Sequence, residues 1–354
     1  MRSARVPPRA AVLVTVAVMA VLIVMAVSTV RGQSAAVHHI IFDTDFALPP
    51  QDDGLALAFV LNSPELDIAG ITTVAGNYNL ARANADVLRM LEIAKREDVK
   101  VYAGASRPLA HVKDAFATSH YGKWWSDDPA PAPPGGFAKK ALEPMAAADF
   151  MVRTVMARPG QIEILAIGPL TNVAAAIRRE PAFVRSVKRI IIMGGALASL
   201  PDGGGNITPN AEYNFWVDPE AARIVLRSGI PVVLSPLNVS MRTSFDKASF
   251  LALASSGTPI AKLIDGQMRP RYESDRHFHP HMYDEVAAAS LVDPTLVKTK
   301  RMVVDVDDTH GMNYGVSVGG TDVWPGAEGA PTIDVQYDID NARFMRLFVE
   351  RVRR

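Results

Sequence analysis

Four carboxylates surround one predicted strand-to-helix turn in the segment 40–59: Asp43, Asp45, Asp52 and Asp53. Like charges that converge repel one another unless a cation neutralises them. The chain has no cysteine and these donors are all oxygens, so a hard cation, Ca²⁺ or Mg²⁺, is the expected partner. Residue types alone leave an alternative, in which Asp52 and Asp53 only stabilise a helix N-terminus and the other two face solvent.

The elements that must position these carboxylates alternate between strand and helix patterns after residue 38. Predicted strands lie at 38–43, 66–76, 99–104, 161–168, 187–196, 230–236, 301–306 and 332–337. Predicted helices lie at 53–63, 80–94, 169–179, 218–228, 246–256, 259–276, 284–292 and 339–352. Between them, 106–140 is rich in Pro, Gly, Trp and His with little periodicity, which favours a long loop.

This alternation predicts an α/β fold, a mainly parallel, Rossmann-like sheet with helices on both faces. Ligands of such folds bind beyond the carboxyl ends of the strands. Polar or glycine-rich clusters fall at those ends, at Asp43 and Asp45, Asn77, Gly168, 194–195 and Asn238. No internal boundary is evident, so 39–354 is expected to form one catalytic domain.

Composition narrows the class of protein. Of 354 residues, 49% are hydrophobic, which is ample for a large core. Lys+Arg and Asp+Glu both number 37, and basic residues do not interleave with aromatic ones, so a nucleic-acid partner is not expected. Without cysteine, disulfides, thiol catalysis and Cys-ligated zinc are excluded.

The N-terminus resembles a targeting segment. Arg2, Arg5 and Arg9 precede an uncharged run over 10–30, and small residues at 34–36 could form a cleavage site. The run is also long enough to span a bilayer. Residues 1–38 therefore read as a signal peptide, which we favour, or as an N-terminal membrane anchor. Both predict an exported protein, periplasmic or extracellular, and both disfavour a buried core helix.

Other motifs follow the aspartate cluster in a fixed order. They are "TTVAGN" at 72–77, "AIGPLTNVA" at 166–174, "MGGA" at 193–196 and "GNITPNAEYNFWVDPEAA" at 205–222. Together they resemble the nucleoside hydrolase family of the inosine/uridine-preferring type, the calcium-dependent N-ribohydrolases. The resemblance covers about 38–350. It implies hydrolysis of a ribonucleoside, or a related N-riboside, to ribose and free base.

The resemblance implies a calcium site. Asp45 would be both a ligand and the base that activates the attacking water. Asp53 would be a bidentate ligand, and the backbone carbonyl of Ile167, just before "GPLTN", would be a third. "MYDEVAAASLVDP" resembles the family segment that completes the shell, which assigns Asp284 as the remaining ligand.

The resemblance also implies a ribose-binding edge, with Asp43 as a support behind the metal ligands. Cleavage of the N-glycosidic bond builds oxocarbenium character, which nearby carboxylates stabilise. Amides and carboxylates along one sugar edge can bind the diol and reject a deoxyribose. The residues implied for substrate binding are Asp52, Asn77, Asn206, Glu212, Asn214 and, by a looser match in "SHYGKWW", His120.

Two departures from the family pattern stand out. Asp45 and Asp52 are separated by the six residues "FALPPQ", three more than the family pattern has, and the metal shell closes only if the extra residues bulge outward. Where many members have a histidine that protonates the leaving base, this chain has Tyr283. Tyr283 or the nearby His281 would then act as the acid. The stretch "HFHPH" at 277–281 could be a metal site, but a polar rim loop is favoured.

Two other functions compete with hydrolysis. The lengthened loop and Tyr283 motivate a non-catalytic riboside-binding protein on the same fold. "IIFDTD" also resembles the nucleophile strand of haloacid-dehalogenase-type phosphatases, although that reading leaves the later motifs unexplained. These motifs do not determine which nucleobase the protein prefers. The family resemblance implies a homodimer or homotetramer.

Overall fold

The computed structural model describes residues 37–354 except 114 and 122–125, and at 120 and 121 only the backbone. Residues 1–36 of the predicted targeting segment 1–38 lie outside this part, and His38 is already the first residue of a strand. Within the described part, His38–Arg354 forms one compact unit. None of the helices so described is long and apolar enough to cross a bilayer.

Nine strands of the described residues form one sheet, in the order β3-β2-β1-β4-β5-β6-β9-β7-β8. The strands from β3 to β9 in this order pair in parallel, and β7 runs antiparallel to both β9 and β8. The predicted mainly parallel α/β sheet is therefore confirmed. Strand bounds are β1 His38–Thr44, β2 Leu66–Thr73, β3 Val101–Ala103, β4 Ile162–Ala166, β5 Arg189–Met193, β6 Val232–Ser235, β7 Val297–Val306, β8 Ser317–Gly320 and β9 Thr332–Ile339.

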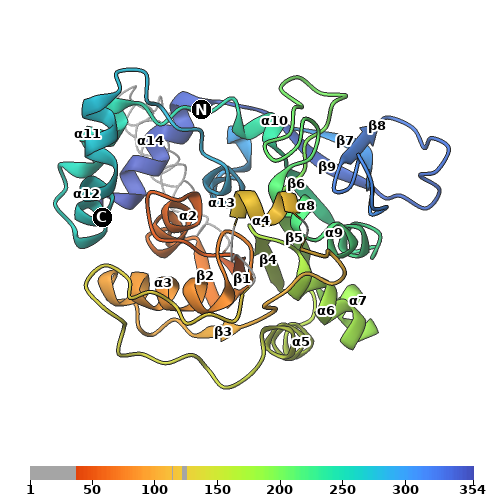
Figure 1. The fold of residues 1–354 in the computed structure, drawn as a ribbon, viewed down its shortest axis with the longest axis horizontal. Helices are drawn as coiled ribbons and strands as arrows, with labels where there is room; N and C mark the ends of the chain where they lie inside the picture. Colours follow the sequence, from red (N-terminus) through yellow and green to blue (C-terminus); the bar gives the residue numbers. More distant parts are fainter. Residues whose placement is uncertain (1–36, 114, 122–125) are drawn as a thin grey trace, which may run out of the picture. The chain divides into compact units, whose positions relative to one another are not determined.

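Helices cover both faces of the sheet (Figure 1). Side chains alternate along β1, so Ile40 and Phe42 join one core while Ile41 joins the other. The first core is completed by α2 (Asp52–Leu61), α3 (Leu80–Ile93), α11 (Lys247–Ala254), α12 (Pro259–Ser274), α13 (Asp284–Val292) and α14 (Asn341–Val352). The second is completed by α5 (Ala147–Ala157), α6 (Thr171–Arg179), α7 (Pro181–Ser186) and α9 (Pro219–Leu226).

Short elements account for most differences from the predicted pattern. The predicted loop segment 106–140 contains α4 (Ala115–Tyr121), and α8 (Tyr213–Val217) and α10 (Leu237–Ser240) lie in segments for which no element was predicted. α5, α7 and β8 were also not predicted. Each spans only a few turns or residues, so its periodicity in the sequence is weak.

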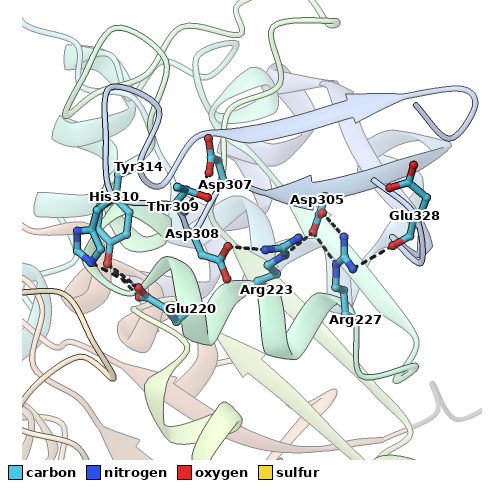
Figure 2. A network of polar contacts seen from close by, with 10 residues as sticks. All are labelled: Glu220, Arg223, Arg227, Asp305, Asp307, Asp308, Thr309, His310, Tyr314 and Glu328. Carbon is cyan, nitrogen blue, oxygen red and sulfur yellow. Dashed lines mark hydrogen bonds and ion pairs between the residues drawn. The ribbon is translucent and has the colours of Figure 1, made fainter. Parts of the chain in front are cut away.

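The antiparallel end of the sheet is fastened to α9 by polar contacts (Figure 2). Arg227 Nε donates to Asp305 Oδ1 on β7 at 3.1 Å, and the Tyr314 hydroxyl donates to Glu220 Oε2 at 2.9 Å. Arg223 forms ion pairs with both Asp305 and Asp308. These contacts hold the β7–β8 region against the parallel part of the sheet.

Candidate active site

A polar cavity of about 270 Å³ lies at the carboxyl ends of β1, β2, β4 and β5. Nine of the residues predicted from the sequence line it: Asp45, Asp52, Asn77, Ile167, Asn206, Glu212, Asn214, Tyr283 and Asp284. Gln51, Met193 and Tyr213 line it too, and were not singled out as site residues. Gln51 and Tyr213 are direct neighbours of predicted residues, which is the signal that could have found them.

Asp45 lies just beyond β1 and is held between two glycines. A Cβ atom on Gly76 would lie 2.1 Å from Asp45 Oδ2, and one on Gly168 would lie 2.6 Å from Oδ1. The backbone N–H of Asn77 donates to Oδ2 at 2.6 Å. Oδ1 is buried and has no hydrogen-bond partner among the described residues. The carboxylate is therefore fixed in direction while one oxygen stays free for a ligand.

Asp53 lies beneath the cavity and is fully buried. The Asn77 side chain donates to its Oδ2 at 2.7 Å, and the Thr44 hydroxyl donates to Oδ1. Asn77 therefore contacts Asp45 through its backbone and Asp53 through its amide. This pair of bonds ties the end of β1 to the start of α2 across the end of β2.

Asp52, Asp53 and Asp284 offer carboxylate oxygens that all lie within 4.8 Å of one another. Asp52 and Asp53 open α2, and Asp284 opens α13, so the partial positive ends of two helices face the group. Burial, followed by the charges of Asp52 and Asp53, raises the pKa of Asp284 well above its usual range. Burial and the charges of Asp45 and Asp52 do the same to the pKa of Asp53.

This arrangement fits a hard divalent cation. The donors are carboxylate oxygens, their mutual repulsion is uncompensated, and Asp45 contributes a buried oxygen without a partner. Burial raises the pKa of Asp45 to about 8, with the charges of Asp52 and Glu212 adding to the effect. A cation among these groups would favour their ionised forms.

Asp43 supports the site from behind. It is fully buried, and its Oδ1 accepts hydrogen bonds from the Thr72 hydroxyl at 2.6 Å and Asn172 Nδ2 at 2.8 Å. Despite these donors, burial raises its pKa to about 6. Asn172 belongs to the "GPLTN" motif, so that motif braces the aspartate strand.

Ile167, whose carbonyl was predicted as a metal ligand, follows β4 and lines the cavity. Its N–H donates to the Asp43 carbonyl at 2.8 Å, which continues the β1–β4 pairing. Its carbonyl accepts a hydrogen bond from Asn214 Nδ2 at 3.2 Å. A carbonyl oxygen has two lone pairs, so the second remains available.

Glu212 is almost fully buried and caps α8. Its two oxygens accept from the backbone N–H groups of Asn214 at 2.8 Å, Phe215 at 3.0 Å and Gly195 at 2.8 Å. Burial nevertheless raises its pKa to about 7. Glu212 therefore both faces the cavity and joins α8 to the glycine exit of β5.

Asn206 and Tyr213 form the opposite rim. Asn206 Oδ1 accepts from the Tyr213 N–H at 2.9 Å, and the Tyr213 hydroxyl donates to the Gly76 carbonyl at 2.7 Å. Tyr213 thus bridges the 205–214 loop and the end of β2.

The six-residue loop 46–51 does not bulge outward, which was the condition set for closing the metal shell, but turns inward over 46–49. Phe46, Ala47 and Leu48 are buried in it. The loop crosses so close to α2 that a Cβ on Gly54 would lie 2.3 Å from a ring carbon of Pro49. The extra residues thus become core, and Asp53 still reaches Asn77 beside Asp45.

The two predicted acids lie apart. Tyr283 lines the cavity, and burial raises its pKa further above the usual phenol value. His281 lines only a neighbouring cavity, which Tyr283 also lines, and its ring centroid is 6.4 Å from that of Tyr283. Its Nδ1 lies 2.7 Å from the Thr243 carbonyl.

The structure gives less support to the remaining predictions about histidines. His120 belongs to α4, but its side chain is outside the described part of the structure. In 277–281, the rings of His279 and His281 are 6.5 Å apart, and among the described residues no histidine belongs to a metal-suitable group. This spacing is consistent with the interpretation of 277–281 as a polar rim loop rather than a metal site.

Glu285 is a buried carboxyl that the motifs did not single out. It is 1% exposed, and neither oxygen has a hydrogen-bond partner among the described residues. Burial and the charge of Asp52 raise its pKa well above the usual range. The backbone N–H groups of Glu285 and Tyr283 lie near this carboxyl and partly lower its pKa, but they do not form hydrogen bonds with it.

Several known proteins of similar sequence are named as enzymes that hydrolyse nucleosides. The chain is 35% identical to the pyrimidine-specific ribonucleoside hydrolase RihA of Citrobacter koseri, over 88% of this chain and 97% of that protein. It is 34% identical to uridine nucleosidase 1 of Arabidopsis thaliana, over 85% of this chain and 89% of that protein.

Solved structures agree. The plant nucleoside hydrolase PpNRh1 superposes with a TM-score of 0.74 at 29% identity, covering 89% of this chain and 98% of that chain. A purine-preferring ribonucleoside hydrolase from Gardnerella vaginalis has the same TM-score and coverage at 28% identity.

The family model described as inosine-uridine preferring nucleoside hydrolase matches residues 40–346. The match includes the aspartate strand, the "GPLTN" turn, the glycine turn at 193–196 and α13. The phosphatase interpretation leaves all of these motifs after the aspartate strand unexplained. The chain therefore belongs to the inosine-uridine preferring nucleoside hydrolase family, and is an enzyme that hydrolyses N-glycosyl bonds.

Proposed function

We propose that this protein hydrolyses the N-glycosidic bond of a ribonucleoside to ribose and free base, using Asp45 as the base that activates water. The observation that carries the proposal is the free, buried Oδ1 of Asp45, held in a cavity beside three further carboxylates. Family membership supplies the bond that is broken.

Calcium is the proposed cofactor, held by Asp45, Asp53, Asp284 and the carbonyl of Ile167. When bound, a calcium ion supplies Lewis acidity to the attacking water and to the ribose diol. Asp52 is the proposed contact to a ribose hydroxyl, and one of its oxygens also lies within the metal-suitable group.

In this mechanism Asp45 accepts a proton as the water oxygen bonds to C1′. The C1′–N bond breaks, and its electron pair goes to the base. Asp52, Asn77, Asn206, Glu212 and Asn214 are the proposed contacts to the ribose hydroxyls. The surrounding carboxylates stabilise the positive charge that develops on the sugar.

Tyr283 is the proposed proton donor to the departing base. The phenol is protonated at neutral pH and can donate a hydrogen bond and then a proton to the leaving nitrogen, although its raised pKa makes it a weaker acid than an ordinary tyrosine. His281 is the proposed alternative donor, and the loosely matched His120 a further substrate contact. Tyr283→Phe and His281→Ala should separate the first two: only loss of the true donor lowers kcat selectively for bases that leave poorly without protonation.

A ribonucleoside panel assayed with calcium and with a chelator tests the proposal. We expect ribose release that requires calcium and that disappears in Asp45→Asn. No ribose from any ribonucleoside at saturating calcium would reject hydrolysis. Calorimetric binding without turnover would instead indicate the riboside-binding alternative.

The protein is further proposed to act outside the cytoplasm, as a homodimer or homotetramer. The charge pattern of residues 1–30 supports export, by a cleaved signal peptide or an uncleaved anchor. Cell fractionation with sequencing of the mature N-terminus distinguishes the two. Light scattering of the purified protein measures the assembly, and a monomer would contradict the oligomer.

A further inference from the structure

A separate cavity of about 350 Å³ lies between the sheet and the end of α13, and we call it the β5–β9 cavity. Among the described residues, none lines both this cavity and the active-site cavity. Arg189, the first residue of β5, lines the β5–β9 cavity, whereas Met193, the last, lines the active site. The lining residues are Arg189, Ile191, Val233, Ser290, Leu291, Pro294, Val297, Thr299, Arg301, Asp334 and Gln336.

Gln336 on β9 is a buried polar side chain without a partner in this cavity. It is 1% exposed, and within the described part of the chain no group donates to its Oε1 and none accepts from its Nε2. The preceding Val335 joins the second core, so Gln336 points to the opposite face of the sheet, where α13 packs. A buried carboxamide is unfavourable unless a ligand or water supplies its hydrogen bonds.

The rest of the wall is largely apolar. Ile191 and Val233 come from the sheet, and Leu291 and Pro294 come from the end of α13 and the turn that follows it. An occupant would therefore lie between apolar side chains of the sheet and of the helix layer. The volume of the cavity falls in the range of small-molecule sites, and apolar walls with a few polar groups are typical of them.

The charged groups at the mouth of the cavity are already paired. Arg189 Nε donates to Glu163 Oε2 at 2.6 Å. Arg301 Nε lies 3.7 Å from Asp334 Oδ1, and another nitrogen of the same guanidinium donates to the Thr332 carbonyl at 3.1 Å. An ionic ligand would have to compete with these partners, so the charge balance favours a neutral one.

The chemistry of Gln336 defines the edge that a ligand must present. Its carboxamide holds an acceptor oxygen beside donor hydrogens. A group with an N–H and an acceptor on neighbouring atoms satisfies both through two parallel hydrogen bonds, as when glutamine binds N6 and N7 of adenine. A hydrocarbon would leave both groups of Gln336 unpaired, and an anion would leave its donors satisfied but its oxygen unpaired.

We propose that the β5–β9 cavity is a second ligand site, which binds a neutral planar heterocycle with a neighbouring donor and acceptor, the chemistry of a free nucleobase, through Gln336. Free bases are also what the proposed hydrolysis would release. Only this source of the ligand rests on the proposed function, because the cavity and Gln336 are separate from the active site.

Crystals of the protein soaked with 5-bromouracil test the location, because anomalous scattering identifies the bromine. We expect a bromine peak in the β5–β9 cavity of the wild type and none there in Gln336→Leu. Bromine at the active site alone, or only water beside Gln336 at saturating 5-bromouracil, overturns the inference.

Equilibrium dialysis with radiolabelled uracil tests binding in solution. The number of uracil sites per chain should fall by one in Gln336→Leu. Gln267→Leu, at an exposed position of α12, is the matched control and should keep the wild-type number. A bromine peak in the crystal without this loss in solution would mean binding at crystal concentration only, and overturns the inference.

A methylated analogue tests the chemistry in the wild type alone. 1,3-Dimethyluracil keeps both carbonyls but has no N–H, so it leaves Oε1 of Gln336 unpaired. It should compete for the Gln336-dependent site at least about tenfold more weakly than uracil, the scale of one lost hydrogen bond. Equal competition would show that the cavity selects only an apolar ring, and overturns the role of Gln336.

Two readouts separate this inference from a structural effect and from the proposed function. Gln336→Leu removes an unpartnered buried group, so its thermal unfolding midpoint should be unchanged or higher, and its kcat/KM for a nucleoside should be unchanged. If Gln336→Leu fails to fold, the bromine position and the 1,3-dimethyluracil competition in the wild type still decide. Absence of turnover for every nucleoside rejects the proposed hydrolysis but leaves these binding results to stand on their own.

Discussion

Asn77 Nδ2 donates to Asp53 Oδ2 at 2.7 Å while the backbone N–H of the same residue donates to Asp45. In Asn77→Ala the backbone bond stays and the side-chain donor is lost. We expect calcium affinity to fall about tenfold or more, because a buried carboxylate oxygen loses its partner. Isothermal titration calorimetry measures the affinity, and an unchanged dissociation constant would contradict this role.

Asp45→Asn should lower kcat at least about 100-fold, because an amide does not take the proton of the attacking water. Circular dichroism and thermal unfolding should show an intact fold. Asp322→Asn, on an exposed loop, is the matched control and should retain full activity. Comparable turnover by Asp45→Asn would assign the base elsewhere.

Gly168→Ala should also inactivate the enzyme although it removes no functional group. The new Cβ would lie 2.6 Å from Asp45 Oδ1 and 2.7 Å from its backbone nitrogen, so Asp45 must move. Gly266→Ala, on α12 with open space around the position, is the control and should be neutral or stabilising. The kcat of both variants is the readout, and full activity in Gly168→Ala would show that Asp45 tolerates displacement.

Calcium should raise the midpoint of thermal unfolding. A ligand that binds only the folded state at 100 times its dissociation constant adds about 2.7 kcal/mol to the free energy of unfolding. Asp53→Asn should lose this shift, yet be no less stable without calcium, because a buried carboxyl with a raised pKa is removed. A full calcium shift in Asp53→Asn would exclude Asp53 as a ligand.

Stability at acid pH should depend on Glu163, at the opposite ends of the strands. Burial alone would raise its pKa, but hydrogen bonds from Lys188, His38 and Arg189 outweigh it and hold the pKa below the ordinary 4.5. A depressed native pKa stabilises the fold above pH about 4.5, and that contribution is lost as pH falls through the native value.

Glu163→Gln should therefore reduce the free energy of unfolding by about 1–3 kcal/mol at pH 7 and by less near pH 3. Urea unfolding at the two pH values measures the difference. Glu350→Gln, from an exposed pair with Arg354, is the control and should change stability little at either pH. If Glu163→Gln lowers the free energy of unfolding equally at both pH values, the predicted link between the pKa of Glu163 and stability is wrong.

The sheet and most site residues could be predicted from the sequence because their signals are local. Strand–helix alternation fixes a parallel sheet, and its strand ends bring Asp45, Asn77 and Ile167 to one edge. The family motifs add Glu212 and Asn214, which α8 turns toward that edge.

Other features depend on tertiary packing and could not be predicted. The segment "FALPPQ" does not by itself predict that Leu48 and its neighbours turn into the core, because an apolar loop could equally bind a partner. Glu285 looks like an ordinary first-turn acid, and only the packing of α13 against α2 buries it. His281 is two residues from Tyr283 in sequence, yet it lines only the neighbouring cavity, whereas Tyr283 lines both.

The loop 46–51, which is buried over 46–49, has a further consequence for the start of α2. If the loop lost one residue while α2 kept its packing, the first turn of the helix would have to supply it, and each residue of an α-helix turns the chain by about 100°. Asp52 and Asp53 would then change direction together, although neither had been substituted. The length of this loop is therefore part of the site, because it decides where Asp52 and Asp53 stand on the helix that faces Asp284.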